Sequence, residues 1–171
     1  MFEIREELAS DIPAIRSVNQ QAFGQDHEGR IVEALRANGA ALLSIVATMD
    51  DQIVGHIMYS PASIDQGSAG QAGGAALGPM AVLPEYQRKG IGSQLIEAGT
   101  RKLTESGCPF VVVVGHPEYY PRFGFQPASN LGIRCEWNVP DNVFMVLVLD
   151  SLKMERISGM TKYRDEFSTV S

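Results

Sequence analysis

The sequence predicts one domain of the α/β (α+β) class, with helices flanking a mixed sheet. Its 171 residues are enough to bury one core, and 44% hydrophobic with 20% charged residues is typical of a globular protein. Segments with apolar residues at helical spacing alternate with segments that have the pattern of strands. Residues 76–114 give an apolar strand, a glycine-containing turn, a helix and a second apolar strand, which together form a βαβ-like unit.

The N-terminal third is predicted to contain a strand, two helices and a hairpin. "FEIREE" alternates apolar and charged side chains, and Ser10 is the expected N-cap of the first helix. Gly24 and Gly39 are expected to end the two helices. The pair Asp50–Asp51 is expected to form the turn of an antiparallel hairpin, in which Gly55 marks a bulge. The expected ranges are 2–7, 11–23, 28–38, 42–49 and 52–64.

The remainder of the chain is predicted to continue the sheet after a loop. "DQGSAGQAGGAA", residues 65–76, is rich in glycine and small residues and is expected to be a mobile loop. In the strand that follows, Gly78–Pro79 should interrupt the ladder, because proline donates no hydrogen bond. "FVVVV" reads as a buried strand of parallel type. The expected strands are 76–83, 110–114, 131–137 and 143–149, the last two pairing antiparallel, with a helix from 91 to Gly107.

Composition and charge exclude several classes of protein. A net charge of −6 argues against a nucleic-acid surface and mildly favours cationic substrates. The two cysteines, Cys108 and Cys135, form no CxxC pattern, are expected to be core thiols, and agree with a reducing compartment. The three histidines show no metal-ligand spacing, so no metal is expected. Apolar runs are far shorter than the roughly 20 residues of a membrane span and no export signal is visible, which predicts a soluble, cytoplasmic protein.

The stretch "LPEYQRKGIGSQLIEAG" predicts an anion-binding turn at the start of a helix. N–H groups at a helix N-terminus have no partner inside the helix, and the helix dipole adds positive potential there. Gly90 and Gly92 allow a ligand to approach the backbone, while Arg88 and Lys89 add positive charge. A pyrophosphate fits this description. The alternative is that the glycines only ease a tight turn between strand and helix.

Three familiar motifs are absent from the chain. The dinucleotide fingerprint GxGxxG would need glycine where Leu95 stands. The Walker pattern fails because Arg30–Ile31 follows the glycine pair Gly24 and Gly29 in place of Lys-Ser/Thr. No GxSxG sequence is present, so a nucleophile elbow of the esterase type has no support.

Two sequence motifs resemble those of a known family. "MAVLPEYQRKGIGSQLI" is similar to the acyl-CoA motif of the GNAT superfamily of N-acetyltransferases, Q/R-x-x-G-x-G/A, with Gln87, Gly90 and Gly92 at its fixed positions. "YYPRFGF" resembles the family's later Y-x-x-x-G-F motif. The family's order of elements, β-α-α-β-β-β-α-β-α-β-β, corresponds to residues 2–149, and the sequence looks most like an uncharacterised bacterial branch of predicted acetyltransferases. The resemblance implies a single-domain GNAT-like fold with a mixed, mostly antiparallel central sheet that is splayed in the middle.

The resemblance also implies a cofactor site and its residues. Acetyl-CoA would be the co-substrate, in a cleft formed where the strand before the glycine turn splays from the strand that begins at Phe110. Backbone groups of Met80, Ala81 and Val82 would hold the pantetheine arm. The pyrophosphate would lie on the turn and helix start, so that the full set of expected cofactor-binding residues is Met80, Ala81, Val82, Gln87, Arg88, Lys89, Gly90, Ile91, Gly92 and Ser93.

Tyr120 is the expected catalytic residue, because it occupies the family position four residues before Gly124. A phenol is a neutral proton donor that can protonate the departing thiolate. Its neighbour Tyr119 is expected to be a packing aromatic. The general base stays open between Glu28, His116, Glu118 and a chain of water molecules. Many family members have an asparagine about seven residues before the tyrosine, and Val113 stands there instead.

These observations predict an acetyl-CoA-dependent N-acetyltransferase that moves an acetyl group to a primary amine of a small molecule or peptide. Two other classes stay open: an acyl-CoA-binding sensor or regulatory module without turnover, and a nucleotide-binding α/β module. Residues 1–150 are expected to form the N-acetyltransferase domain and 151–171 an extension that docks on it. Within this extension, residues 159–167 are expected to be an irregular segment that docks through Tyr163 and Phe167. The expected assembly is a monomer or a homodimer, with no nucleic-acid or membrane partner.

Overall fold

The predicted fold class is confirmed in the computed structural model, which describes residues 1–169. These residues form a mixed nine-stranded sheet in the order β1-β2-β3-β4-β5-β8-β6, with β9 pairing with β3 and β7. The pairs β4–β5 and β7–β9 are parallel, and the pairs β1–β2, β2–β3, β3–β9, β5–β8 and β6–β8 are antiparallel. The strands are β1 (Glu3–Glu6), β2 (Leu43–Met49), β3 (Gln52–Asp65), β4 (Gln71–Val82), β5 (Phe110–Val114), β6 (Gln126–Pro127), β7 (Ile133–Cys135), β8 (Phe144–Val148) and β9 (Gly159–Lys162). The helices are α1 (Ile12–Phe23), α2 (His27–Ala37), α3 (Ile91–Glu105) and α4 (Glu166–Thr169).

The chain divides into two compact units. Unit 1 contains residues 1–60, 77–99 and 165–169, and unit 2 contains residues 61–76 and 100–164. Three of the boundaries fall inside β3, β4 and α3, and the fourth falls between β9 and α4. Each unit has its own packing and is described separately.

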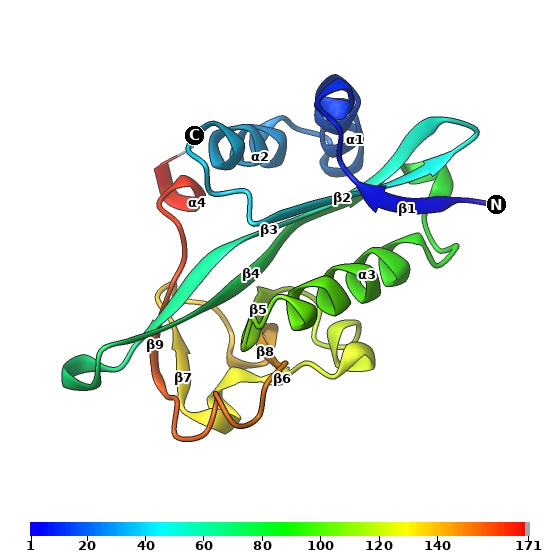
Figure 1. Ribbon diagram of the computed structural model, residues 1–171. Helices are drawn as coiled ribbons and strands as arrows, with labels where there is room; N and C mark the ends of the chain where they lie inside the picture. The colour runs from blue at the N-terminus through cyan, green and yellow to red at the C-terminus, as the bar shows by residue number, and fades with distance from the viewer. Residues whose placement is uncertain (170–171) are drawn as a thin grey trace. The chain divides into compact units, whose positions relative to one another are not determined.

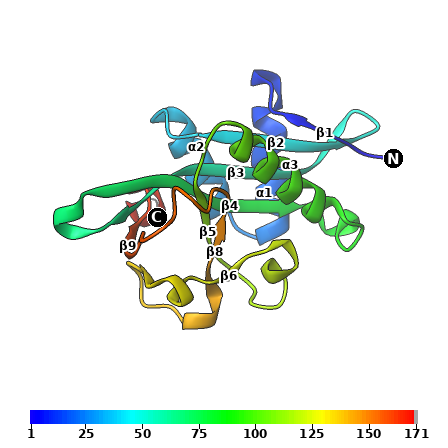
Figure 2. The same ribbon diagram turned by 60° about the horizontal axis from the view of Figure 1, so that its bottom comes forward.

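In unit 1, helices cover both faces of the strands. Figure 1 shows α1 and α2 on one side of β1, β2 and β3 and α3 on the other, and the turned view of Figure 2 brings α3 in front of these strands. Successive side chains of a strand point to opposite faces. In β3, His56 accordingly contacts Asn19 of α1, whereas a methyl group on Gly55 would lie 3.0 Å from Ile91 of α3. Because both faces are covered, β2 and most of β3 are buried.

The helices of unit 1 begin and end at identifiable residues. The prediction that Ser10 is the N-cap of α1 is wrong, because a short 3₁₀ turn, Ala9–Asp11, precedes the helix and Asp11 is the residue at its N-terminus. The Asp11 carboxylate accepts hydrogen bonds from the Leu8 N–H at 2.7 Å and from Arg5 Nη1 at 2.6 Å, which fixes the entry to the helix. Gly24 ends α1 in the left-handed region at φ 71°, as the sequence predicts.

The hairpin of β2 and β3 is confirmed, including its bulge. Asp50 and Asp51 both have positive φ, 50° and 63°, which gives the tight turn. Ala47 lies opposite Gly55, but Thr48 lies opposite Ile53, so β3 contains one extra residue at this point. The bulge therefore falls at Gly55 and the residue before it.

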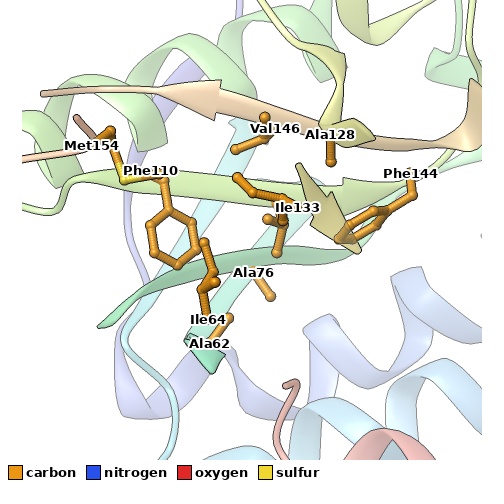
Figure 3. Close-up of a cluster of buried hydrophobic side chains, with 10 residues drawn as sticks. Ala62, Ile64, Ala76, Phe110, Ala128, Ile133, Phe144, Val146 and Met154 are labelled. Atoms are coloured by element: carbon orange, nitrogen blue, oxygen red, sulfur yellow. The ribbon is translucent and has the colours of Figure 1, made fainter. Parts of the chain in front are cut away.

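Unit 2 has a separate apolar core, which Figure 3 shows in close-up. Most of its side chains come from β3, β4, β5, β7 and β8, and Ala128 and Met154 come from turns. Cys135 packs against this core, as expected of a core thiol. The buried members are Ala62, Ile64, Ala76, Phe110, Val112, Ala128, Ile133, Phe144, Val146 and Met154.

The prediction of a mobile loop over residues 65–76 is wrong. β4 begins at Gln71, and Ala75 and Ala76 pair in parallel with residues of β5. The small residues serve close packing: a methyl group on Gly74 would lie 2.5 Å from the ring of Phe110. The parallel ladder between β4 and β5 consists of the pairs Ala75↔Val111 and Ala76↔Val112. The splay of β4 from β5 beyond these two residue pairs stays a prediction.

Two predictions about the C-terminal third are also wrong. Residues 131–137 do not pair with 143–149, because β7 pairs in parallel with β9, while β8 lies between β5 and β6. The segment 159–167 is not irregular, since it supplies β9 and the first residues of α4. Gly159 explains how β9 reaches β3, because a Cβ at this position would lie 2.0 Å from the Asp65 carbonyl oxygen. A single glycine gave no signal for such a close approach of two backbones.

Candidate functional site

The predicted glycine turn connects the end of β4 to the start of α3 in unit 1. The Leu83 N–H donates to the Val54 carbonyl of β3 at 2.9 Å, which holds the chain where β4 ends. Gln87 Nε2 donates to the Val82 carbonyl at 2.9 Å, so the glutamine of the motif ties the turn back to the strand. Arg88 and Gly90 have positive φ, 63° and 83°, and reverse the chain before the helix.

The start of α3 presents backbone donors to this turn. The Gln94 N–H donates to the Gly90 carbonyl at 3.1 Å, so Gly90 is the N-cap residue of the helix. The N–H groups of Ile91, Gly92 and Ser93 belong to the first turn and have no carbonyl partner within the helix. These donors and the dipole of a 15-residue helix give positive potential at this end.

The side chains of the turn leave room for a ligand and add charge. Gln87, Arg88, Lys89 and Gly90 are exposed, and Lys89 Nζ lies 5.6 Å from the centre of the Tyr86 ring. Ile91 is buried and anchors the helix start. The arrangement suits an anion with several oxygens, which can accept from backbone donors while arginine and lysine approach from solvent.

The predicted pantetheine residues lie on the last part of β4, also in unit 1. Ala81 is buried, and Met80 and Val82 are half-buried on the strand directly before the turn. The Val82 carbonyl already accepts the Gln87 hydrogen bond. The structure therefore brings Met80–Val82 and Gln87–Ser93 together on one continuous strand–turn–helix segment.

Tyr120 lies in unit 2, at the start of a 3₁₀ turn that ends before Gly124. Its ring packs edge-on against Tyr119 at 5.2 Å and against Phe125 at 5.5 Å between ring centres. The Gly115 backbone lies against the same ring, because a Cβ there would be 2.4 Å from Tyr120 Cε2. These contacts hold the phenol in one orientation.

Burial controls the protonation of Tyr120. The residue is 7% exposed, and burial, with a smaller effect of Tyr119, raises the pKa of Tyr120 to about 12. The phenol therefore keeps its proton at neutral pH and is a hydrogen-bond donor. Tyr119 is half-buried and carries the Arg122 guanidinium over its ring at 5.1 Å, in agreement with a packing role.

The candidate bases differ in their surroundings. Glu28 lies in the first turn of α2 in unit 1, where both of its carboxylate oxygens accept from Gln25 Nε2, at 3.1 and 3.3 Å. His116 and Glu118 are exposed in unit 2, in the segment between β5 and Tyr120. Val113, at the position where the family has asparagine, is buried within β5 and pairs with Met145.

Unit 1 also contains a buried polar network that the sequence did not predict. Asn19 Nδ2 donates to His56 Nδ1 at 3.3 Å, so His56 Nε2 carries the proton toward Ser44 Oγ at 2.8 Å. Ser44 donates in turn to Glu7, and Arg36 donates to both Glu7 oxygens at 2.9 and 3.0 Å. Five elements or their ends are joined through side chains that are far apart in sequence. No sequence motif marks such a set.

His56 is neutral in this network. Burial is the main cause that lowers its pKa, Glu7 opposes that shift, Arg36 adds to it, and the pKa of His56 falls to about 3. Burial acts to raise the pKa of Glu7, but hydrogen bonds from Arg36 and Ser44 outweigh it, so this pKa lies below its ordinary value of 4.5. The network therefore contains one neutral imidazole and one ion pair.

Neither a metal-ligand cluster nor a membrane-spanning helix occurs among residues 1–169. Residues 1–169 contain no group of three or more His, Cys, Asp or Glu side chains that could hold a metal ion. Within the same range, every helix is too short or too polar to cross a membrane.

Comparison with known proteins identifies the family. Residues 40–127 match the family described as "Acetyltransferase (GNAT) domain". The chain is 34% identical over 166 residues to the uncharacterized N-acetyltransferase YhbS of Escherichia coli K12, with 96% of this chain and 98% of that protein covered. It is 36% identical over 146 residues to the uncharacterized N-acetyltransferase YjhQ of the same strain, with 84% and 80% covered.

Solved structures agree with this result. The crystal structure of Escherichia coli YhbS in complex with CoA matches with a TM-score of 0.93 and 30% identity, covering 99% of this chain and 93% of that one. A GNAT family acetyltransferase from Brucella melitensis in complex with acetyl-CoA matches with a TM-score of 0.81 and 34% identity, covering 98% and 99%. Fold and sequence together define an acetyltransferase. The chain belongs to the GNAT acetyltransferase family.

Proposed function

We propose that the protein is an acetyl-CoA-dependent N-acetyltransferase that acetylates a primary amine of a small molecule or peptide. The observation that carries the proposal is the turn at Gly90, where free backbone donors, two cationic side chains and a helix dipole meet at one exposed site. The two similar structures with bound CoA and acetyl-CoA support the choice of ligand.

The residues of unit 1 fit the phosphate and pantetheine parts of this ligand. N–H groups of Ile91, Gly92 and Ser93 and of the preceding turn would donate to the pyrophosphate, with Arg88 and Lys89 adding charge. The backbone of Met80–Val82 would bind the pantetheine arm. The bond from Gln87 to the Val82 carbonyl would hold these two parts of the site in register.

The bound ligand would supply an acetyl thioester, which a neutral amine attacks at the carbonyl carbon. The carbon–sulfur bond then breaks, and the Tyr120 hydroxyl would donate its proton to the departing sulfur. A pKa of about 12 keeps that proton on Tyr120 until negative charge develops beside it. The same burial that raises the phenol pKa also raises the proton affinity of a thiolate placed next to it, which favours the transfer.

The amine must lose a proton before or during attack. Glu28, His116, Glu118 and a water chain remain the candidate bases, because the strength of base needed depends on the acceptor. The net charge of −6 mildly favours a cationic acceptor.

The proposed transferase domain is residues 1–150, and residues 151–171 are its proposed extension. The cytoplasmic location and a monomeric or homodimeric state are predictions from the sequence.

The test is an amine screen that detects free thiol, performed with the wild-type protein, Tyr120→Phe and Tyr119→Phe. We expect acetyl-CoA and amine-dependent thiol release by the wild type. Tyr120→Phe should lower kcat by roughly 10²-fold or more, the range of a lost proton donor, while acetyl-CoA affinity stays within about threefold. Tyr119→Phe removes a hydroxyl from the adjacent ring and should behave like the wild type.

Two other outcomes would contradict parts of this proposal. Equal activity of Tyr120→Phe and wild type would remove the tyrosine from the mechanism while leaving the transferase function intact. Tight acetyl-CoA binding with no turnover on any amine would favour a sensor.

A further inference from the structure

The bulge of β3 touches both ends of the glycine turn. The Val54 carbonyl accepts from the Leu83 N–H at 2.9 Å, just before the turn begins. The next residue, Gly55, faces the first residue of α3, just after the turn ends: a Cβ on Gly55 would lie 3.0 Å from Ile91 Cγ2. Two consecutive residues of one bulge thus contact the strand exit and the helix entry.

Position 55 needs glycine because there is no room for a side chain, and not because the backbone has a conformation that only glycine adopts. Its φ lies outside the left-handed region, so alanine can adopt the same backbone. A Cβ would also lie 3.2 Å from Leu95 Cδ1 and 3.4 Å from Ala47 Cβ, which closes the pocket on three sides. Only a residue without a side chain lets α3 approach the sheet this closely.

The neighbours of Gly55 have little freedom to move aside. Ile91 is 1% exposed and Leu95 is fully buried, so neither side chain can rotate toward solvent. A second contact holds α3 further along, because a Cβ on Gly99 would lie 2.3 Å from the Tyr59 ring of β3. With the helix pinned at Gly99, a methyl group at Gly55 must shift the start of the helix by a few tenths of an ångström.

We propose that Gly55 is a positioning residue of the transferase. It determines how closely the first turn of α3 packs against β3, and so where the N–H groups that bind the acyl-CoA pyrophosphate lie. This inference rests on the proposed function, since it assumes that the pyrophosphate binds at this turn. Gly55 acts through Ile91 and does not touch the ligand. The bulge explains both contacts: with one extra residue in β3, Gly55 faces α3 and the Val54 carbonyl faces the Leu83 N–H.

The test compares Gly55→Ala with Gly73→Ala by titration of acetyl-CoA and by steady-state kinetics. Gly73 is the matched control, because it also lies in a strand and a Cβ there meets no atom within 4 Å. Gly55→Ala should raise the Kd and the KM for acetyl-CoA on the order of tenfold, because hydrogen bonds to phosphate lose alignment. The kcat at saturating acetyl-CoA should stay within about twofold, because the reacting atoms are not displaced.

A second pair of variants separates positioning from a general loss of stability. Ile91→Ala removes Cγ2 and makes room for the new methyl group, whereas Ile91→Val keeps Cγ2. In the Gly55→Ala background, Ile91→Ala should return the Kd to within about threefold of the Ile91→Ala single variant. Ile91→Val should give no rescue.

The outcomes distinguish the two proposals. Absence of acetyl-CoA binding by the wild type would overturn the proposed function. Wild-type binding with an unchanged Kd for Gly55→Ala would overturn the positioning role alone, even if the melting temperature of that variant falls. Equal rescue by Ile91→Ala and Ile91→Val would also overturn it.

Discussion

The neutral His56 makes the stability of the protein depend on pH in a calculable way. The buried imidazole has a pKa of about 3 in the folded protein and an ordinary value of 6.5 when unfolded. Below pH 6.5 the unfolded chain binds a proton that the folded protein does not, so stability is complete above this pH and decreases as the pH falls toward 3. At pH 5.0 the unfolded chain is favoured by 1.5 pH units at 1.36 kcal/mol each, a loss of about 2 kcal/mol.

Urea denaturation of the wild type, His56→Gln and His116→Gln at pH 7.5 and pH 5.0 measures this loss. Glutamine can accept from Asn19 and donate to Ser44, but it does not titrate. The lowered pKa of Glu7 places its own effect below pH 4.5, outside this range. We expect His56→Gln to lose about 2 kcal/mol less than the wild type between the two pH values, and the exposed His116→Gln to follow the wild type. The same loss in all three proteins would refute the reasoning.

Two further predictions concern packing in unit 2. Gly74→Ala should lower the free energy of unfolding by roughly 2–3 kcal/mol, because the new methyl group lies 2.5 Å from the fully buried Phe110, whereas Gly73→Ala should change it by less than about 0.5 kcal/mol; equal values from urea denaturation would contradict this packing. Gly115→Ala should lower kcat on the order of 10²-fold by displacing the Tyr120 ring, measured by thiol release at saturating acetyl-CoA, and an unchanged kcat would mean that the ring position is not important for turnover.

Local patterns predicted the parts of the fold that local forces determine. The hairpin turn at Asp50–Asp51, the end of α1 at Gly24 and the parallel strand 110–114 are confirmed, because turn chemistry and apolar runs are encoded in neighbouring residues. The site turn was visible for the same reason, since its donors, glycines and cations are consecutive in the sequence. The family resemblance then supplied the ligand that the local pattern alone left open.

The predictions were wrong or absent where contacts between segments far apart in the sequence determine the structure. The small residues of 65–76 suggested a loop, but their size serves the approach of Phe110. β7 was expected to pair with the apolar strand nearest in sequence and instead pairs with β9, whose own pattern is weak. The network around His56 was missed because its members, from Glu7 to His56, are joined only after the sheet and helices have assembled.

Binding of acetyl-CoA at the Gly90 turn is the central claim, and calorimetric titration of the wild type, Gly92→Glu and Gly73→Glu tests it directly. A glutamate at Gly92 complements the dipole of α3 and so preserves the helix, but it places negative charge where the pyrophosphate is proposed to bind. Gly73→Glu adds the same charge at an exposed glycine with open space around it. We predict tight binding by the wild type and Gly73→Glu and at least a 100-fold weaker affinity for Gly92→Glu, about 2.7 kcal/mol. Equal affinity of all three proteins, or no binding by the wild type, would contradict the claim.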